Sequence, residues 1–286
     1  MVDFATAHRK GSRMTPGLSI NLATTRAQWT LPQAIEGCLR HGVGGIAPWR
    51  DQVHAVGLAE AARIIRASGL KVTGLCRGGM FPAATPEKRQ ANIDDNRLAI
   101  EDAVALGADC LVLVVGGLPE GSRDIAGARE MVADGLAAIL PEARAANMPL
   151  AIEPLHPMYA ADRACVNTLR HALDLCDSLG EGIGVAVDVY HVWWDPELAA
   201  QIARAGSRIL AHHICDWLVP TRDLLLDRGM MGDGVIDLRA IRRMVEGAGF
   251  HGLQEVEIFS ARNWWKRDAD AVIHTCIERY NALCLL

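Results

Sequence analysis

The sequence has no segment in which basic residues concentrate, and its 29 Lys and Arg are outnumbered by 34 Asp and Glu, for a formal charge of −5. This balance argues against a nucleic-acid partner, because proteins that bind nucleic acid present clustered cations to the phosphates. No apolar run approaches the about 20 residues that a membrane-spanning helix needs, and no apolar stretch typical of a secretory signal follows the charged N-terminus. We therefore expect a cytoplasmic protein with no membrane partner.

Two further absences reduce the number of fold classes that fit the sequence. The eight cysteines include no C-x-x-C pair and no dense spacing, so we interpret them as reduced core residues rather than a disulfide framework. The first predicted strand is followed by no G-x-G-x-x-G, the phosphate-binding loop that an open dinucleotide-binding sheet would carry there. With half of its 286 residues hydrophobic and 22% charged, the chain is predicted to be globular.

The sequence does have a regular alternation of short apolar or β-branched runs with longer amphipathic stretches. The eight predicted strands are residues 18–22, 45–47, 71–75, 110–115, 150–153, 184–188, 209–215 and 252–258. The eight predicted helices are residues 31–41, 57–67, 88–106, 126–145, 168–178, 196–203, 238–246 and 268–284. Eight successive βα units favour an α/β fold, a single (β/α)8 TIM barrel over residues 1–286, with residues 1–16 as a flexible N-terminal extension.

Polar residues end four consecutive predicted strands, and the functional residues of such barrels lie at the carboxyl ends of the strands. These residues are Glu153, Asp188, the pair His212 and His213, and Glu255 with Glu257. Any one carboxylate alone is as readily explained as a helix cap or an arginine partner. Four together, with no Lys or Arg in the same motifs, predict a bound divalent cation, and these ligand types suit Mn, Mg, Co or Zn.

The motifs around these residues carry a family resemblance. The runs IEPLHP, VAVDVYHVWWD, AHHICDW with the following DRGMMGDGVIDL, and EVEIFS resemble the sugar phosphate isomerase/epimerase superfamily, the xylose isomerase-like TIM barrels. This group includes ketose 3-epimerases, inosose isomerases and dehydratases, and endonuclease IV; the acidic balance does not support the last branch. The resemblance implies one divalent ion, with Mn favoured, held by Glu153, Asp188, His213 and Glu257.

Two of these ligands have neighbouring alternatives. Period-2 alternation puts His212 and His213 on opposite faces of the strand, so only one of them can face the other ligands. We choose His213 because it matches the H-I pattern of the family. Glu255 and Glu257 share a face, and we choose Glu257 because it is nearer the carboxyl end and matches E-x-F. Glu255 remains a candidate for a residue that contacts a metal ligand and not the metal itself.

The resemblance also implies roles in catalysis and substrate binding. Glu153 and Glu257 would be acid/base groups as well as ligands, and His191 and Arg228 would contact the substrate. His156 stands where many epimerases carry a polar amide, so it is either a third catalytic group or a loop histidine.

Three further residues lie beyond predicted strand ends. Arg50 and Arg77 could bind a hydroxyl or a phosphate, or pair with a neighbouring Asp. Trp193 belongs to a set of five tryptophans that could stack on a sugar ring or pack against another subunit; the others are Trp49, Trp194, Trp264 and Trp265.

These observations predict a metal-dependent isomerase or epimerase of a small keto-sugar or polyol derivative, acting by proton transfer through a metal-stabilised enediolate. One alternative is a lyase or dehydratase that eliminates a β-leaving group from a keto-sugar or keto-inositol, with His156 protonating the leaving group. Another is a non-catalytic sugar-binding or assembly subunit. We expect a small-molecule sugar as the partner and a homo-oligomer, with a hetero-subunit left open.

Overall fold

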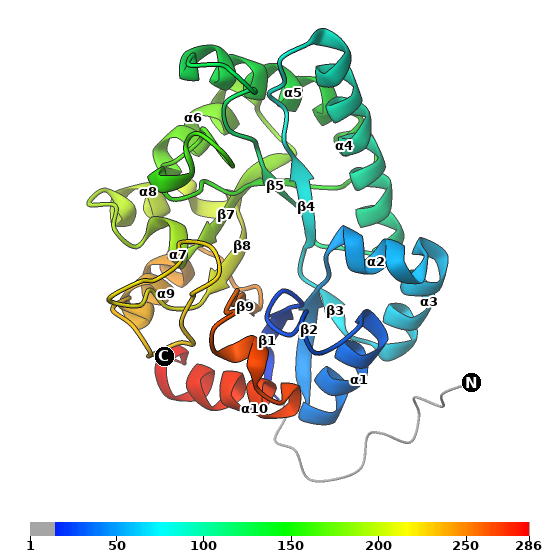
Figure 1. The fold of residues 1–286 in the computed structure, drawn as a ribbon, viewed down its shortest axis with the longest axis vertical. Helices are drawn as coiled ribbons and strands as arrows, with labels where there is room; N and C mark the ends of the chain where they lie inside the picture. Colours follow the sequence, from blue (N-terminus) through cyan, green and yellow to red (C-terminus); the bar gives the residue numbers. More distant parts are fainter. Residues whose placement is uncertain (1–14, 286) are drawn as a thin grey trace.

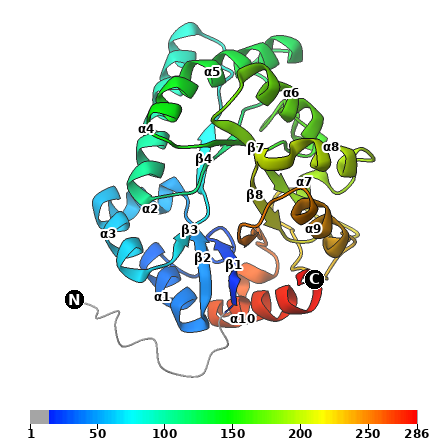
Figure 2. The same cartoon turned by 180° about the vertical axis from the view of Figure 1, so that it is seen from behind.

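The barrel predicted from the sequence is present. The computed structural model describes residues 15–285, in which nine parallel strands form one sheet that curls around a central axis, with helices outside it (Figure 1). The strand order is β3-β2-β1-β9-β8-β7-β6-β5-β4. The view from behind shows the same ring of helices around the strands (Figure 2).

Every predicted strand overlaps an observed one. The strands are β1 (Thr15–Asn21), β2 (Val43–Ala47), β3 (Lys71–Val72), β4 (Leu75–Gly79), β5 (Leu111–Val114), β6 (Leu150–Ile152), β7 (Ile183–Asp188), β8 (Ile209–Ile214) and β9 (Gln254–Val256).

The third predicted strand, residues 71–75, is divided into two. β3 pairs with β2, whereas β4 pairs with β5, so the chain passes from one neighbour to the other at Thr73 and Gly74. The Cys76 N–H donates to the Pro48 carbonyl at 3.0 Å, and Trp49 pairs with Cys76 in a parallel bridge. Nine strands therefore occupy eight barrel positions.

Eight helices overlap the predicted ones, and two short helices were not predicted. The helices are α1 (Leu31–His41), α2 (Arg50–Val56), α3 (Leu58–Ser68), α4 (Pro86–Leu106), α5 (Ile125–Ala145), α6 (Leu169–Leu179), α7 (Val189–Val192), α8 (Leu198–Ala205), α9 (Leu238–Gly247) and α10 (Ala269–Arg279). Short 3-10 helices cover Pro157–Tyr159, Gly206–Arg208 and Trp264–Lys266. α2 and α7 are too short to show a helical period in the sequence.

Both chain ends differ from the prediction. The last predicted helix ends at Arg279, and a π-helical turn over Tyr280–Cys284 follows. Thr15 and Pro16 belong to β1 and not to an extension, because the Thr15 N–H donates to the Gly42 carbonyl at 2.9 Å. The rest of the predicted extension, residues 1–14, lies outside the described residues.

Two apolar layers hold the barrel together. The larger layer packs the helices against the outside of the strands. A smaller cluster consists of short side chains, namely Cys76, Cys110, Val112, Ala151, Ala186 and Ala211. All eight cysteines are free and buried, as expected of core residues. Among the described helices, none combines the length and the apolar character needed to cross a membrane.

Candidate metal centre and active site

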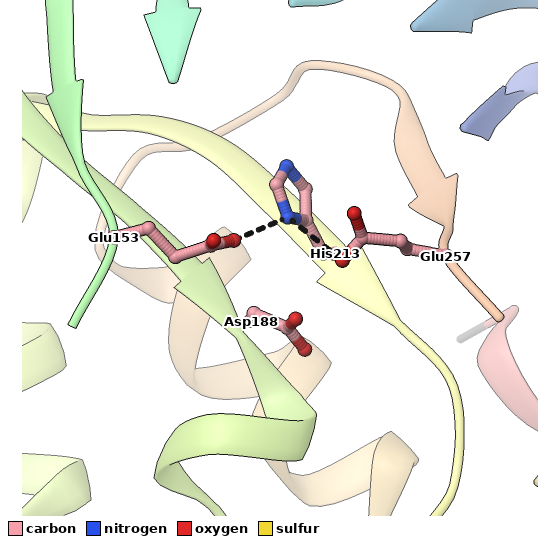
Figure 3. Close-up of side chains that lie close together, drawn as sticks. All are labelled: Glu153, Asp188, His213 and Glu257. Atoms are coloured by element: carbon pink, nitrogen blue, oxygen red, sulfur yellow. Dashed lines mark hydrogen bonds and ion pairs between the residues drawn. The ribbon is translucent and has the colours of Figure 1, made fainter. Parts of the chain in front are cut away.

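Four side chains from four neighbouring strands meet at the carboxyl ends of β6 to β9 (Figure 3). Glu153 follows β6, Asp188 ends β7, His213 lies in β8 and Glu257 follows β9. Each offers one donor atom, these atoms lie within 4.8 Å of one another, and all four residues are buried. The sequence predicted this set, and the fold brings it together because parallel strands end at the same rim of a barrel.

The imidazole of His213 is the centre of the group. Its Nδ1 lies 2.9 Å from Glu153 Oε1 and 3.9 Å from Glu257 Oε2, and Figure 3 shows the two carboxylates reaching toward it from opposite sides. Its Nε2 lies 3.3 Å from Glu255 Oε1. Glu255 in turn accepts hydrogen bonds from Asn21 Nδ2 at 2.8 Å and Thr73 Oγ1 at 2.7 Å.

This geometry distinguishes Glu257 from Glu255 and His213 from His212. Glu257 belongs to the group, whereas Glu255 lies behind His213, in the place considered for it from the sequence. His212 is buried elsewhere and hydrogen-bonds through Nδ1 to Gln254, so the two histidines face opposite ways as alternation predicts.

The position of Arg228 differs from what the sequence predicted about the charge of the group. The strand-end motifs contain no Lys or Arg, but a loop arginine provides the positive charge: Arg228 Nη1 lies 2.9 Å from Asp188 Oδ2 and 3.0 Å from Glu257 Oε2. Its side chain is 4% exposed, and its guanidinium lies 4.4 Å from the centroid of Tyr190 and 5.2 Å from that of Phe259. The carboxylates are therefore partly compensated by the protein itself.

The loop between β8 and α9 is held so that Arg228 reaches this position. The Arg228 N–H donates to the Phe259 carbonyl at 2.9 Å. Asp216 fastens the rest of the loop by accepting hydrogen bonds from the backbone N–H groups of Trp217, Gly232, Gly234 and Ile236, at 2.8–3.0 Å.

Burial and mutual repulsion perturb the charges of the group. Burial raises the pKa of Glu257 to about 8, and the neighbouring Glu153 carboxylate adds to the rise. Burial would also raise the pKa of Asp188, but the Arg228 guanidinium holds it well below its usual range. Burial opposes a charged His213, yet Glu255 and Glu153 raise its pKa well above the ordinary value. The group therefore favours additional positive charge.

The donor set fits a divalent cation. Three carboxylates face one guanidinium and one imidazole, and the four convergent donors are oxygen and nitrogen atoms of the kind that bind Mn, Mg, Co or Zn. Glu153, Asp188, His213 and Glu257 are the residues that would hold such an ion.

A cavity of about 520 Å³ lies against this group and is lined by Glu153, Glu257, His191 and Arg228. Trp49, Phe259 and Trp265 provide aromatic surface, and Leu225 and Leu226 provide aliphatic surface. Of the five tryptophans singled out from the sequence, Trp49 and Trp265 line this cavity.

The other predicted site residues are divided between the cavity and its surroundings. His191 and Arg77 line the cavity. Arg50 lies in an adjoining cavity, where Asp95 at 2.8 Å and Asp102 at 3.0 Å neutralise it. Arg50 therefore matches the pairing alternative.

His156 and Trp193 are not among the described residues that line the cavity. The His156 ring stacks on Trp217 at 5.1 Å between centroids, and its Nδ1 accepts a hydrogen bond from the Met158 N–H at 3.2 Å. Trp193 packs against the same Trp217. The position of His156 matches the alternative of a loop histidine, with its backbone N–H donating to His191 Nδ1 at 3.2 Å.

Several cavity residues were missed from the sequence. Tyr159 and Arg163 lie in the loop after β6, and Arg26 lies in the loop after β1. The sequence signal for them was only their place after a predicted strand, which many other residues share.

Comparison with known proteins agrees with this architecture. Residues 35–275 match the family model of the xylose isomerase-like TIM barrel, whereas no curated protein matches the sequence. A solved structure, protein SMc04130 from Sinorhizobium meliloti 1021, is 70% identical with a TM-score of 0.93, over 94% of this chain and 98% of that chain.

Two more distant solved structures share the fold. The IOLI protein with a bound zinc atom is 21% identical, with a TM-score of 0.80, over 94% of this chain and 98% of that chain. A D-allulose 3-epimerase from Methylomonas sp. is 19% identical, with a TM-score of 0.75, over 95% and 98% of the two chains. Because the family model covers most of the sequence, this chain belongs to the xylose isomerase-like TIM barrel family.

Proposed function

We propose that this chain is a metal-dependent isomerase or epimerase of a small keto-sugar or polyol derivative. The observation that carries the proposal is the arrangement of Glu153 and Glu257, which approach His213 from opposite sides and line the same cavity (Figure 3). Two carboxylates so placed can serve a planar substrate from both faces.

The reaction begins when one carboxylate removes the proton from the carbon beside the substrate carbonyl. The electron pair of the broken C–H bond leaves an enediolate, and a carboxylic acid then returns a proton. Return to the opposite face of the same carbon gives epimerisation. Return to the neighbouring carbon, together with transfer of the hydroxyl proton from one oxygen of the enediolate to the other, gives isomerisation. A divalent ion bound by the four residues would polarise the carbonyl and stabilise negative charge on oxygen.

Three other features of the cavity support a sugar-like substrate. Arg228 and His191 present N–H and imidazole groups to substrate oxygens. Trp49 and Trp265 offer flat apolar surfaces to the carbon face of a sugar. The family match and the likeness to a sugar 3-epimerase agree with this choice.

Deuterium exchange tests the proposal directly. The metal-loaded protein is incubated in deuterated water with a panel of ketohexoses beginning with D-fructose, and NMR detects deuterium on the carbon beside the carbonyl. Glu153→Gln and Glu257→Gln remove an ionisable base, so we expect exchange to fall by about 10²–10⁴-fold. Glu278→Gln, an identical change on exposed α10, is the matched control and should exchange as the unmodified protein does.

Metal content must be measured in each variant, because a lost ion would imitate a lost base. Wild-type exchange in both metal-loaded variants would rule out the two carboxylates as bases. A lyase would lose the mass of its leaving group, and a sugar-binding subunit would give neither exchange nor product.

A further inference from the structure

Two arginines on the cavity wall stand apart from the proposed metal ligands. Arg77 lies in β4, and Arg163 lies in the loop after β6; both line the cavity that Glu153 and Glu257 also line. The end of β4 is fixed, because Asn96 Oδ1 accepts from the Gly79 N–H at 2.6 Å and Asn96 Nδ2 donates to the Gly79 carbonyl at 2.7 Å. Arg77 therefore projects from a fixed backbone.

These two arginines differ from the others around the cavity in their partners. Arg228 is paired with Asp188 and Glu257, Arg26 with Asp51, and Arg50 with Asp95 and Asp102. Within residues 15–285, the side chain of Arg77 forms no hydrogen bond and no ion pair. For Arg163 the ion-pair partner is the adjacent, exposed Asp162, at 3.8 Å, and its guanidinium lies 5.6 Å from the centroid of Tyr159.

The positive charge of Arg77 is only partly compensated by the protein. Burial lowers the pKa of the Arg77 guanidinium, and the positive charge of Arg163 lowers it further. The carboxylates of Glu153 and Asp51 raise the pKa in part, but neither forms an ion pair with Arg77, and a half-buried cation without a paired carboxylate costs free energy. Asp51 is paired with Arg26 instead.

We propose that Arg77 and Arg163 bind an oxyanion substituent of the substrate, a phosphate or a carboxylate, at the end remote from the reacting carbons. Both groups match the planar fork of a guanidinium, which donates two parallel hydrogen bonds to such oxygens. This assignment of a substrate class rests on the proposed function, whereas the binding of an oxyanion by the two arginines does not.

The cavity has room for a substrate longer than the reacting carbons. A second cavity of about 410 Å³ adjoins the first and shares Arg26, Trp49 and Arg77 as lining residues. Arg77 therefore stands where the two cavities meet, and a substituent beyond the sugar carbons has room there. An anionic end at the arginines and a keto end at Glu153 and Glu257 would fix the direction in which the substrate lies.

Inorganic phosphate tests the arginine pair without turnover. Binding to metal-free protein is measured by calorimetry, so that no ion in the acidic group can hold the phosphate. Arg77→Gln and Arg163→Gln should each weaken binding about tenfold or more, the fold-change expected for losing a hydrogen bond to a charged group. Arg89→Gln removes the same charge from an exposed ion pair with Asp134 and should leave the affinity unchanged.

Arg77→Lys gives a second variant in case the Gln variants fold poorly. Lysine keeps the positive charge but lacks the planar guanidinium that donates two parallel hydrogen bonds. The affinity of this variant for phosphate should therefore lie between those of the wild type and Arg77→Gln. Wild-type affinity in both Gln variants, with their folded state verified by circular dichroism, would overturn the proposal. The same holds if the unmodified protein binds no phosphate.

Three matched sugars then identify the oxyanion. D-Fructose, D-fructose 6-phosphate and D-fructuronate differ only at carbon 6, and their affinities for metal-loaded protein are compared. Preference for the phosphate or for the carboxylate, lost in Arg77→Gln, supports the proposal and names the group; equal affinity for all three contradicts it. Phosphate binding without any deuterium exchange would reject the proposed reaction while leaving the oxyanion site in place.

Discussion

Glu255 Oε1 lies 3.3 Å from Nε2 of His213, on the far side of the imidazole from Glu153. A carboxylate at this distance attracts a proton to Nε2, and a proton there would leave Nδ1 to bind a cation. Asn21 and Thr73 hold the Glu255 carboxylate in turn. We therefore expect Glu255 to orient the imidazole of His213.

The first prediction concerns this contact. Glu255→Gln removes the charge behind the imidazole, and we expect the affinity for Mn or Zn to fall by about 10–100-fold, the usual effect of losing such a partner. Calorimetric titration of the metal-free protein with each ion measures the change in affinity. Glu278→Gln on α10 is the matched control, and equal affinity in the two variants would show that Glu255 does not position His213.

The second prediction concerns the metal itself. Because four buried donors converge and carry excess negative charge, we expect about one divalent ion per chain, lost together with activity on chelation. Elemental analysis and a thermal unfolding curve measure both. Free metal at about 100 times its Kd should add about 2.7 kcal/mol to the free energy of unfolding. A metal-free protein with full activity would contradict the assignment.

The third prediction separates the two neighbouring histidines. His213→Ala should abolish metal binding, because it removes the donor at the centre of the group. His212→Ala should keep the metal but lower the free energy of unfolding by about 2 kcal/mol, since it breaks a buried hydrogen bond with Gln254 and leaves a void. Metal analysis and denaturant unfolding of the same two variants distinguish these outcomes. Equal metal loss in two folded variants would contradict the opposite facing of the side chains.

The four proposed metal ligands lie together in the structure because strand geometry brings them to one rim of the barrel. Asp188 and His213 lie within or at the end of a strand, so alternation and the shared direction of parallel strands bring them together. Glu153 and Glu257 follow strands by one residue and are placed by the same rule. Strand positions predict the rim of the barrel, whereas the choice of His213 over His212, and in part of Glu257 over Glu255, came from the family pattern.

Contacts between distant segments decide the partners of the predicted arginines. Arg228 reaches the site because the loop that carries it is fastened to Asp216, twelve residues earlier, and to Phe259 on the next unit. Arg50 and Arg77 both follow predicted strand ends, but Arg50 pairs with Asp95 and Asp102 from α4, while the Arg77 side chain forms no ion pair within residues 15–285. Such partners are fixed by packing between elements, which the pattern of a single sequence does not report.

The fourth prediction concerns Asp227, which orders the loop just before Arg228. Asp227 is fully buried and accepts three hydrogen bonds from Arg222, from its backbone N–H at 3.1 Å, from Nε at 2.9 Å and from Nη2 at 2.8 Å. Burial alone would raise the pKa of this carboxyl, but the hydrogen bonds from Arg222 outweigh it and hold the pKa below its usual value.

A lowered pKa in the folded state stabilises the fold above the ordinary aspartate range, and this stability is lost as the pH falls through the lowered value. Asp227→Asn should therefore reduce the free energy of unfolding at neutral pH by about 1 kcal/mol. The expected loss is small because the Arg222 side chain is half exposed and solvent screens its charge. The difference from the wild type should shrink as the pH falls below about 4, where the wild-type carboxyl also becomes neutral. Urea unfolding from pH 7 to pH 3 measures it, with Asp134→Asn as the control for an exposed carboxylate. A difference that stays constant over this range would mean that the charge of Asp227 does not stabilise the loop.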